Sequence, residues 1–181
     1  MPKYIKSIII LSAIILVFCD MAVSGGLSTR FVEVKMKDLE PGRVYSVKEK
    51  TNLPLLINNT TETNTFDIEI APEMPVEYNL VSGYEPIPDL SWVIIENNSF
   101  KEVGPGQSAE TDIMISIPKG KKYLGKKYQV YIYSHTAGGA NLRLGIMSRI
   151  LIEIASAPST AEQPVTAPGP VEKKPVPGKN K

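Results

Sequence analysis

Few residues of the chain could act as catalytic groups or metal ligands, and the first to consider is a histidine. His135 is the only histidine of the 181-residue chain, so any histidine-activated nucleophile would have to pair with it. Ser134 is its neighbour, but adjacent residues of a strand point to opposite faces and cannot readily form such a pair. A metal site would need further histidines or cysteines, or a carboxylate cluster, and the sequence shows no such pattern. The favoured interpretation of His135 is an exposed residue at a strand end.

Paired carboxylates could cleave a glycosidic bond, with one acting as acid and the other as nucleophile or base. The candidates for such a pair are Asp67, Glu69, Glu85 and Asp89. Their spacing carries no signature: Asp67 and Glu69 fit a solvated strand face, and Asp89 fits a turn. A carbohydrate-active hydrolase is therefore the least favoured interpretation, and the sequence predicts a protein that is not an enzyme and uses no cofactor.

A cluster of lysines is the strongest local charge feature of the chain. A loop between two predicted strands carries Lys119, Lys121, Lys122, Lys126 and Lys127. Such a loop could bind an anionic envelope polymer, such as a teichoic acid, lipopolysaccharide or a phospholipid surface. The alternative, which we favour, is a solvated hairpin loop whose lysines discourage edge-to-edge pairing.

A stripe of rings follows the next predicted strand. Tyr131, Tyr133 and His135 alternate with apolar residues, so they should share one face of that strand. Exposed aromatic residues in a row suit a contact surface for protein or glycan. The alternative is that the other sheet, or the long loop over 72–90, covers this face. The candidate binding residues are therefore these three rings and the five lysines.

Apolar and polar residues alternate with a period of two along the body of the chain, which predicts β-strands rather than helices. Pro-Gly and Asn-rich clusters separate the alternating runs and mark turns. The sequence therefore predicts an all-β protein, an immunoglobulin-like antiparallel sandwich of seven to eight strands, with a closed barrel as the alternative. Trp92 is expected in its core. The expected strands are 29–37, 43–49, 53–58, 65–71, 91–96, 108–117, 126–135 and 142–154.

The N-terminus has the layout of a secretory signal peptide over 1–24. Two lysines precede an apolar run from Ile8 to Phe18, and small residues follow before Gly25. The run is shorter than the roughly 20 residues that a membrane-spanning helix needs. Cys19 is the only cysteine, but large Phe18 departs from the lipoprotein pattern, so a lipid anchor on Cys19 is disfavoured. We expect an exported protein of the periplasm or cell surface, with no transmembrane anchor after signal cleavage.

Two further segments follow the signal peptide. We expect the sandwich to occupy 25–156, and the Pro-, Ala- and Lys-rich segment 157–181 to be a disordered tail. That tail has six prolines and no aromatic residue, and its four lysines against two glutamates give it a net charge of +2. The whole chain has a formal net charge of only +1, which lacks the strongly basic character of a nucleic-acid-binding protein.

One part of the pattern resembles a known group of proteins. A Pro-Gly turn at 103–108 leads into a strand over 110–117 that ends at Ile-Pro, and a second strand with a Tyr-x-Val-x-Ile core follows over 125–134. This arrangement resembles bacterial cell-surface immunoglobulin-like domains. They include the peptidoglycan-binding domain of WxL-interacting proteins and the N-terminal domain of pilus chaperones. The chain departs from both: it shows no C-terminal membrane helix and no room for a second sandwich domain. The arginine and lysine pair by which pilus chaperones hold a subunit carboxylate cannot be matched here.

These features together predict a non-catalytic exported binding or scaffolding module of a prokaryotic cell envelope. The expected partner is an envelope protein or a cell-wall polymer, and no nucleic acid is expected. The main alternative is a periplasmic chaperone-like module that acts by β-strand augmentation on an exported subunit. The sequence leaves the oligomeric state open.

Overall fold

The computed structural model describes residues 25–137 and 143–157; the predicted signal segment 1–24 and residues 158–181 lie outside the described residues. Within these ranges the chain is mostly β-structure, as the alternation predicted. The strands are β1 (Leu27–Ser28), β2 (Glu33–Leu39), β3 (Val44–Ser46), β4 (Leu55–Asn59), β5 (Phe66–Glu73), β6 (Glu85–Pro86), β7 (Val93–Ile95), β8 (Ser99–Val103), β9 (Ser108–Thr111), β10 (Ile113–Ser116), β11 (Lys127–Ala137) and β12 (Gly145–Ile154). The short helices are α2 (Val47–Thr51), η1 (Glu77–Asn79), η2 (Leu90–Trp92) and η3 (Lys121–Tyr123).

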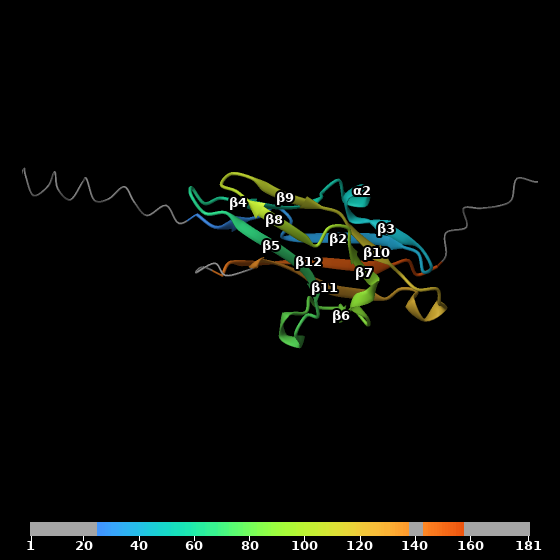
Figure 1. Cartoon of the computed structure of the whole chain (residues 1–181). Helices are drawn as coiled ribbons and strands as arrows, with labels where there is room; N and C mark the ends of the chain where they lie inside the picture. The colour runs from blue at the N-terminus through green and yellow to red at the C-terminus, as the bar shows by residue number, and fades with distance from the viewer. Residues whose placement is uncertain (1–24, 138–142, 158–181) are drawn as a thin grey trace, which may run out of the picture.

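The strands form two layers, which Figure 1 shows one above the other. The larger sheet has the order β2-β12-β11-β5-β8, with β6 attached to β11. The other layer consists of β1-β4-β9 and β3-β10-β7. The first and last described residues lie at opposite ends of the sandwich, and the segment that carries η1 and β6 lies on the outer side of the larger sheet (Figure 1). The immunoglobulin-like sandwich is thus confirmed.

Two strand pairs run parallel, whereas the sequence predicted an antiparallel sandwich. The chain starts in the smaller layer, where β1 pairs with β4, and then crosses to the larger sheet, where β2 pairs in parallel with β12. That pairing begins at Arg149 opposite Glu33. Residues 145–148 of β12 therefore pair with β11 alone.

One continuous hydrophobic core lies between the layers, as the period of two requires. Ile57, Ile115, Ile132 and Ile150, two from each layer, are completely buried. Trp92 is 5% exposed, as expected of a core residue, although it lies in η2 rather than in a strand. Its ring packs edge-on against two tyrosines at the border of the core, Tyr123 and Tyr128.

Several local expectations were wrong in detail. The strand expected over 43–49 stops at Ser46, because the Ser46 hydroxyl caps α2 by accepting the Glu49 N–H. The sequence did not predict β8, whose pairing with β5 shifts register between Phe66 and Ile68. Asn59 belongs to an Asn-rich cluster of the kind expected to mark a turn, yet it ends β4 and is 1% exposed, and its amide nitrogen donates to the carbonyls of Asn64 and Val103. No helix in the described ranges has the length and apolar character needed to cross a membrane.

Candidate functional site

Exposed apolar side chains converge on one groove at the outer face of the larger sheet. The groove has a volume of about 550 Å³. Within the described residues, five of the seven large hydrophobic side chains that are exposed line this groove. Exposed apolar side chains that gather in one patch mark interaction sites on soluble proteins. The groove is therefore the candidate binding site. The five are Val32, Met74, Val76, Tyr78 and Met147, and we call the cavity that they share with Tyr131 and Arg149 the outer groove.

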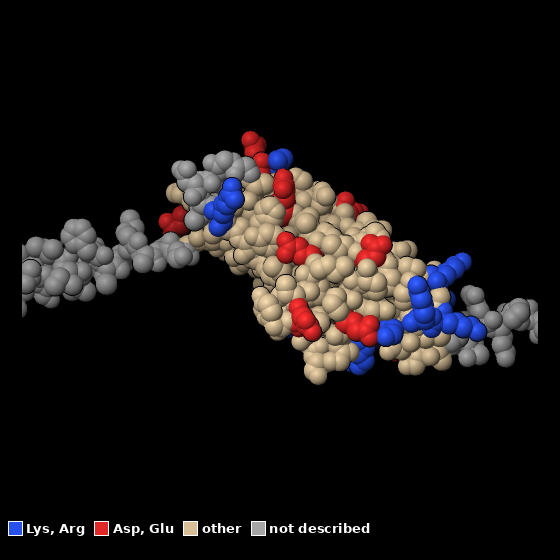
Figure 2. Space-filling model, turned by 90° about the horizontal axis from the view of Figure 1, so that it is seen from below, with Lys and Arg blue, Asp and Glu red and all other residues tan. Residues whose placement is uncertain are grey.

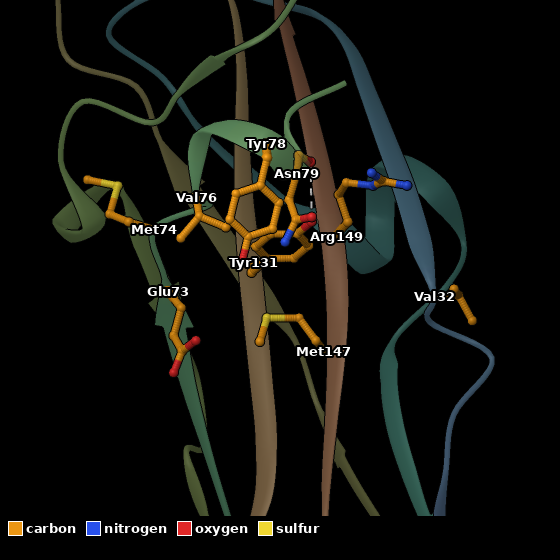
Figure 3. Close-up of a pocket in the computed structure, with 9 residues that line it drawn as sticks. All are labelled: Val32, Glu73, Met74, Val76, Tyr78, Asn79, Tyr131, Met147 and Arg149. Carbon is orange, nitrogen blue, oxygen red and sulfur yellow. Dashed lines mark hydrogen bonds between the residues drawn. The ribbon is translucent and has the colours of Figure 1, made fainter. Parts of the chain in front are cut away.

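Figure 3 shows how three parts of the chain build the outer groove. Met147 and Tyr131 form its floor on β12 and β11. Tyr78 projects over this floor from η1, and its side chain is 86% exposed. Val32 closes the far side, just before β2 begins. Apolar side chains from distant parts of the sequence therefore face one space that is open to solvent.

A buried glutamine fixes the wall that carries Tyr78. Gln129 on β11 points outward from the core, yet it is completely buried beneath the 72–90 segment. Its Oε1 accepts the Val81 N–H at 2.9 Å, and its Nε2 donates to the Asn79 carbonyl at 2.9 Å. The Gln129 carbonyl also accepts the Ile87 N–H at 3.0 Å. Three hydrogen bonds from one residue thus tie this segment to the sheet, and its strand β6 pairs in parallel with β11.

The three predicted rings share the outer face of β11, as expected, but they lie in two neighbouring cavities. Tyr131 lies in the outer groove, and its hydroxyl reaches the Asn79 carbonyl at 3.4 Å. Tyr133 and His135 line a second cavity of about 410 Å³ and stack on each other, with ring centroids 4.9 Å apart. A Cβ atom added to Gly145 would lie 2.6 Å from the Tyr133 hydroxyl, so this glycine makes room for the Tyr133 ring. His135 is half-buried rather than exposed.

Charged residues at the outer groove are mostly acidic. Arg149 pairs with Glu33, with Nη2 and Oε2 2.6 Å apart, so its charge is already compensated. Glu73 lines the groove and Glu77 adjoins Tyr78, and neither has an ion-pair partner among the described residues. Figure 2 shows acidic side chains spread across the middle of this face and basic ones gathered at one end. A ligand that is apolar and carries positive charge would suit such a surface.

Beyond Gln129 the outer face is closed by a network around Glu153. The Tyr84 hydroxyl donates to Glu153 Oε1 at 2.6 Å, and the ammonium groups of Lys127 and Lys35 lie 3.5 and 3.6 Å from the same oxygen. The hydrogen bond from Tyr84, with the two lysine charges, holds the pKa of Glu153 below its ordinary value. This network fastens the 72–90 segment to β12 and so fixes the limit of the outer groove.

The lysine cluster is divided by the fold. Its segment connects β10 in one layer to β11 in the other, so it is a crossover with a short helix, and the expected hairpin loop was wrong. Lys126 pairs with Glu85 at 2.8 Å, which raises the pKa of Lys126, and Lys127 pairs with Glu153. The remaining three have no acidic partner among the described residues, although the Lys122 ammonium lies 4.9 Å from the centroid of the Tyr123 ring. They are Lys119, Lys121 and Lys122.

The carboxylates considered for glycoside cleavage have other partners. Asp67 accepts the Glu102 N–H and pairs with Lys101, and these contacts lower the pKa of Asp67. Asp89 caps η2 by accepting the Ser91 N–H at 2.8 Å, as expected of a turn residue. Glu85 pairs with Lys126. Glu69 lies apart from these, at the second cavity beside His135. A general acid for glycoside cleavage needs a raised pKa, whereas the hydrogen bond from the Ser91 N–H lowers the pKa of Asp89, as the contacts of Asp67 do for that residue.

The edge strands of the larger sheet are short or irregular. β2 presents Lys35 and Lys37 and changes direction at Asp38, whose φ is 55°. β8 has five residues and an irregularity at Glu102, whose φ is 54°. Charge and bulges of this kind reduce pairing with another chain. Residues 145–148 of β12 pair with β11 on one side only, so their other side is an open edge, and Met147 of this stretch lines the outer groove.

Of the residues that line the outer groove, the sequence singled out Tyr131 as a candidate and the 72–90 loop as a long segment able to carry binding, but nothing in it brought these together with Val32 and Met147. No signal in the sequence joins Val32, Tyr78 and Met147, because more than 40 residues separate each from the next. Gln129 gave a weak signal, since it is a neutral polar residue among tyrosines at an outward position. Its partners lie 48 and 50 residues away, so only the fold reveals its role.

Comparison with known proteins supports the fold. No protein-family model matches the chain, and no curated protein sequence matches it either. Among solved structures, PapD-like domain 7 of human CEP192, described as an ASH/PapD-like domain, has a TM-score of 0.51 at 12% identity over 72% of this chain and 86% of that chain. The periplasmic chaperone SfaE gives 0.43 at 14% identity, and the class 5 fimbriae chaperone CfaA gives 0.42 at 14% identity. The chain covers 57% of the length of each chaperone chain. At 12% identity the likeness to the CEP192 domain shows the fold alone, an immunoglobulin-like sandwich.

Proposed function

We propose that this protein is an exported, non-catalytic binding module of a prokaryotic cell envelope, and that it binds a protein partner in the outer groove. The convergence of five of the seven exposed large hydrophobic side chains on this one cavity carries the proposal. The signal-like pattern of residues 1–24 supports export. The PapD-like fold is compatible with a binding role but does not select one.

Tyr78 is the residue whose burial would contribute most. Its side chain is 86% exposed, so a partner that covers it removes nearly all of a tyrosine surface from water. A tyrosine buries on the order of 150–250 Å² and often acts as a hot spot of binding. We therefore expect Tyr78→Ala to cost about 2 kcal/mol of binding free energy, which is about thirtyfold in affinity.

The test is a crosslinked pull-down of tagged residues 25–181 from an envelope extract of the native host, read by mass spectrometry. Tyr78→Ala and Met147→Ala remove groove contacts. Val44→Ala and Ile94→Ala remove apolar groups from the opposite layer whose exposure, 54% and 50%, is close to the 47% of Met147. We expect one dominant protein to be captured by the wild type and by both controls, and to be lost with the groove variants. Equal loss with the control variants, or equal capture by all four, would contradict the proposal.

Strand augmentation remains the alternative mode of binding a protein. It would use the open edge of β12 at 145–148, since the other edges of the larger sheet are charged or irregular. The N–H of Arg149 donates toward the β2 side, so along the strand the N–H of Met147 faces the open edge. Met147→Pro removes this edge N–H, and Met147→Ala, which keeps it, is the matched control. Capture that is abolished by Met147→Pro and unaffected by Met147→Ala and Tyr78→Ala would favour augmentation over the groove.

A second candidate function is binding to an anionic polymer at the lysine-rich end. The observation that favours it is that Lys119, Lys121 and Lys122 have no acidic partner among the described residues, at the end where Figure 2 shows basic side chains gathered. Replacement of these three by alanine should weaken co-sedimentation with anionic phospholipid vesicles and reduce its dependence on salt. Lys101→Ala, at a lysine already paired with Asp67, is the matched control.

A further inference from the structure

We propose that the proline- and lysine-rich segment 158–181 of the same chain docks in the outer groove and limits access of a partner to it. This inference rests on the proposed function only in treating the outer groove as the contact site; the docking itself needs no partner. Three observations carry it: the chemistry of the groove, the charge around it, and the point at which the chain leaves the sandwich.

The outer groove has the chemistry that recognises proline-rich chains. Tyr78 and Tyr131 supply two aromatic rings at one cavity, and Met74 and Met147 supply flexible apolar contacts. Proline-rich segments favour the extended polyproline helix, which docks on aromatic-lined grooves with little loss of chain entropy. Residues 158–181 contain six prolines and no aromatic residue of their own. The groove supplies the rings that such a segment lacks.

Charge complements this fit. Glu73 in the groove and Glu77 beside Tyr78 have no ion-pair partner among the described residues. The segment carries two pairs of lysines, Lys173 with Lys174 and Lys179 with Lys181, on either side of Pro175 and Pro177. Its net charge of +2 opposes the acidic middle of the face in Figure 2. Lysines that flank the prolines can therefore reach the acidic rim while the prolines contact the rings.

The segment can also reach the groove. The strand β12 leads directly into it, and the chain leaves the sandwich where the Gly125 N–H donates to the Ala155 carbonyl at 3.1 Å. Ten residues separate Ala157 from Met147, so the path back along β12 is about 33 Å. The sixteen residues 158–173 in a polyproline helix span about 50 Å. Pro175, Pro177 and their lysines therefore lie within reach of the groove of their own molecule.

Methionine methyl NMR of residues 25–181 tests this directly. Met74 and Met147 line the groove, while Met36 in the core and Met114 in β10 of the opposite layer serve as internal controls. Two tail variants remove the two proposed contributions: Pro175→Ala with Pro177→Ala, and Lys173→Glu with Lys174→Glu. We expect both to shift the methyl signals of Met74 and Met147 and to leave those of Met36 and Met114 unchanged. Unchanged signals of Met74 and Met147 in both variants would overturn the proposal.

A spin label separates docking within one molecule from docking between copies. Residues 25–181 contain no cysteine, so Val176→Cys provides a single labelling site. Attached to the isotope-labelled chain, the label should broaden the methyl signals of Met74 and Met147 and spare that of Met36. Equal broadening when the label is carried only by an unlabelled second copy would overturn the intramolecular proposal.

These readouts contain no partner, so they are independent of the pull-down. Docking that is detected without any captured protein would leave the tail proposal standing and remove the proposed function. Capture of a protein through the groove, with no effect of the tail variants on the methyl signals, would leave the proposed function standing and remove the tail proposal. If both hold, Pro175→Ala with Pro177→Ala should increase the amount of partner captured.

Discussion

Replacement of Gln129 by methionine tests whether one buried amide positions the wall of the outer groove. Methionine keeps the length and approximate volume of glutamine but cannot form its hydrogen bonds to Asn79 and Val81. Each such bond contributes about 0.5–1.5 kcal/mol net, so their loss predicts about 1–3 kcal/mol of destabilisation. Asn79 is exposed, and its freed carbonyl can bond to water, which favours the lower half of this range.

We expect Gln129→Met to lower the stability of the 72–90 segment more than that of the sheet beneath it. The Val81 N–H donates to Gln129 alone in the described structure, so its hydrogen exchange should accelerate in Gln129→Met more than that of β11 amides. Tyr78 lies in the segment that these two hydrogen bonds hold, so its side chain should lose its fixed position over the outer groove. We therefore expect weaker partner capture even at temperatures where the variant is fully folded.

Urea unfolding and hydrogen exchange measure the two effects, and Gln107→Met is the matched control. Gln107 is an exposed glutamine whose Oε1 accepts one hydrogen bond, from the Gly104 N–H at 2.9 Å. Its replacement should change stability by no more than about 0.5 kcal/mol. The Asn79 carbonyl keeps the Tyr131 hydroxyl as a donor at 3.4 Å, so the decisive readout is Val81. A loss in Gln129→Met as small as that of the control, with unchanged exchange at Val81, would refute the role given to Gln129.

Three further predictions address other parts of the face. Gly145→Ala places a methyl group 2.6 Å from the Tyr133 hydroxyl, so the stack of Tyr133 on His135 should open, seen as loss of the nuclear Overhauser contact between the rings. The lowered pKa of Glu153 contributes stability that is present above the ordinary glutamate pKa of 4.5. This stability is lost as the pH falls through the lower pKa of the folded protein. Glu153→Gln should therefore flatten the acid limb of a plot of urea midpoint against pH. Asn59→Ala removes a buried amide that donates to two carbonyls and accepts from the Thr61 hydroxyl. It should lower the free energy of unfolding by about 2–4 kcal/mol in urea titration, whereas Asn98→Ala, at an exposed asparagine, should change it by no more than about 0.5 kcal/mol.

The sequence predicted the parts of this fold that depend on local pattern. A period of two identified β11 and β12, because each presents one buried and one outward face over ten or more residues. The same pattern put Tyr131 and Tyr133 on a common face. It could not separate Ser46, where a side-chain cap ends one strand and begins α2, from the strand residues before it.

The outer groove could not be predicted because it depends on contacts between distant segments. The alternation along β12 places Met147 and Leu151 on the same outward face, yet Met147 is 47% exposed and Leu151 only 2%. What distinguishes them is whether the 72–90 segment covers the sheet at that point. That segment has no period of its own, and Gln129, which anchors it, looks in sequence like any other outward polar residue. The ion pairs of Lys126 and Lys127 could not be predicted for the same reason, since Glu85 and Glu153 approach these lysines only in the folded chain.

The partial cover of this sheet face is itself the argument for a function there. Where the 72–90 segment lies on the sheet, it buries Leu151 and Gln129 and satisfies every polar atom of the glutamine side chain that it meets. Where it stops, a protein with no partner to bind would place polar residues at the outward positions of β11 and β12. Tyr131 and Met147 stand there instead, and Tyr78 and Val32 add apolar surface from outside the two strands. Exposed apolar side chains at these positions increase neither solubility nor stability. A molecule or segment that binds in the groove is the simplest physical explanation for them.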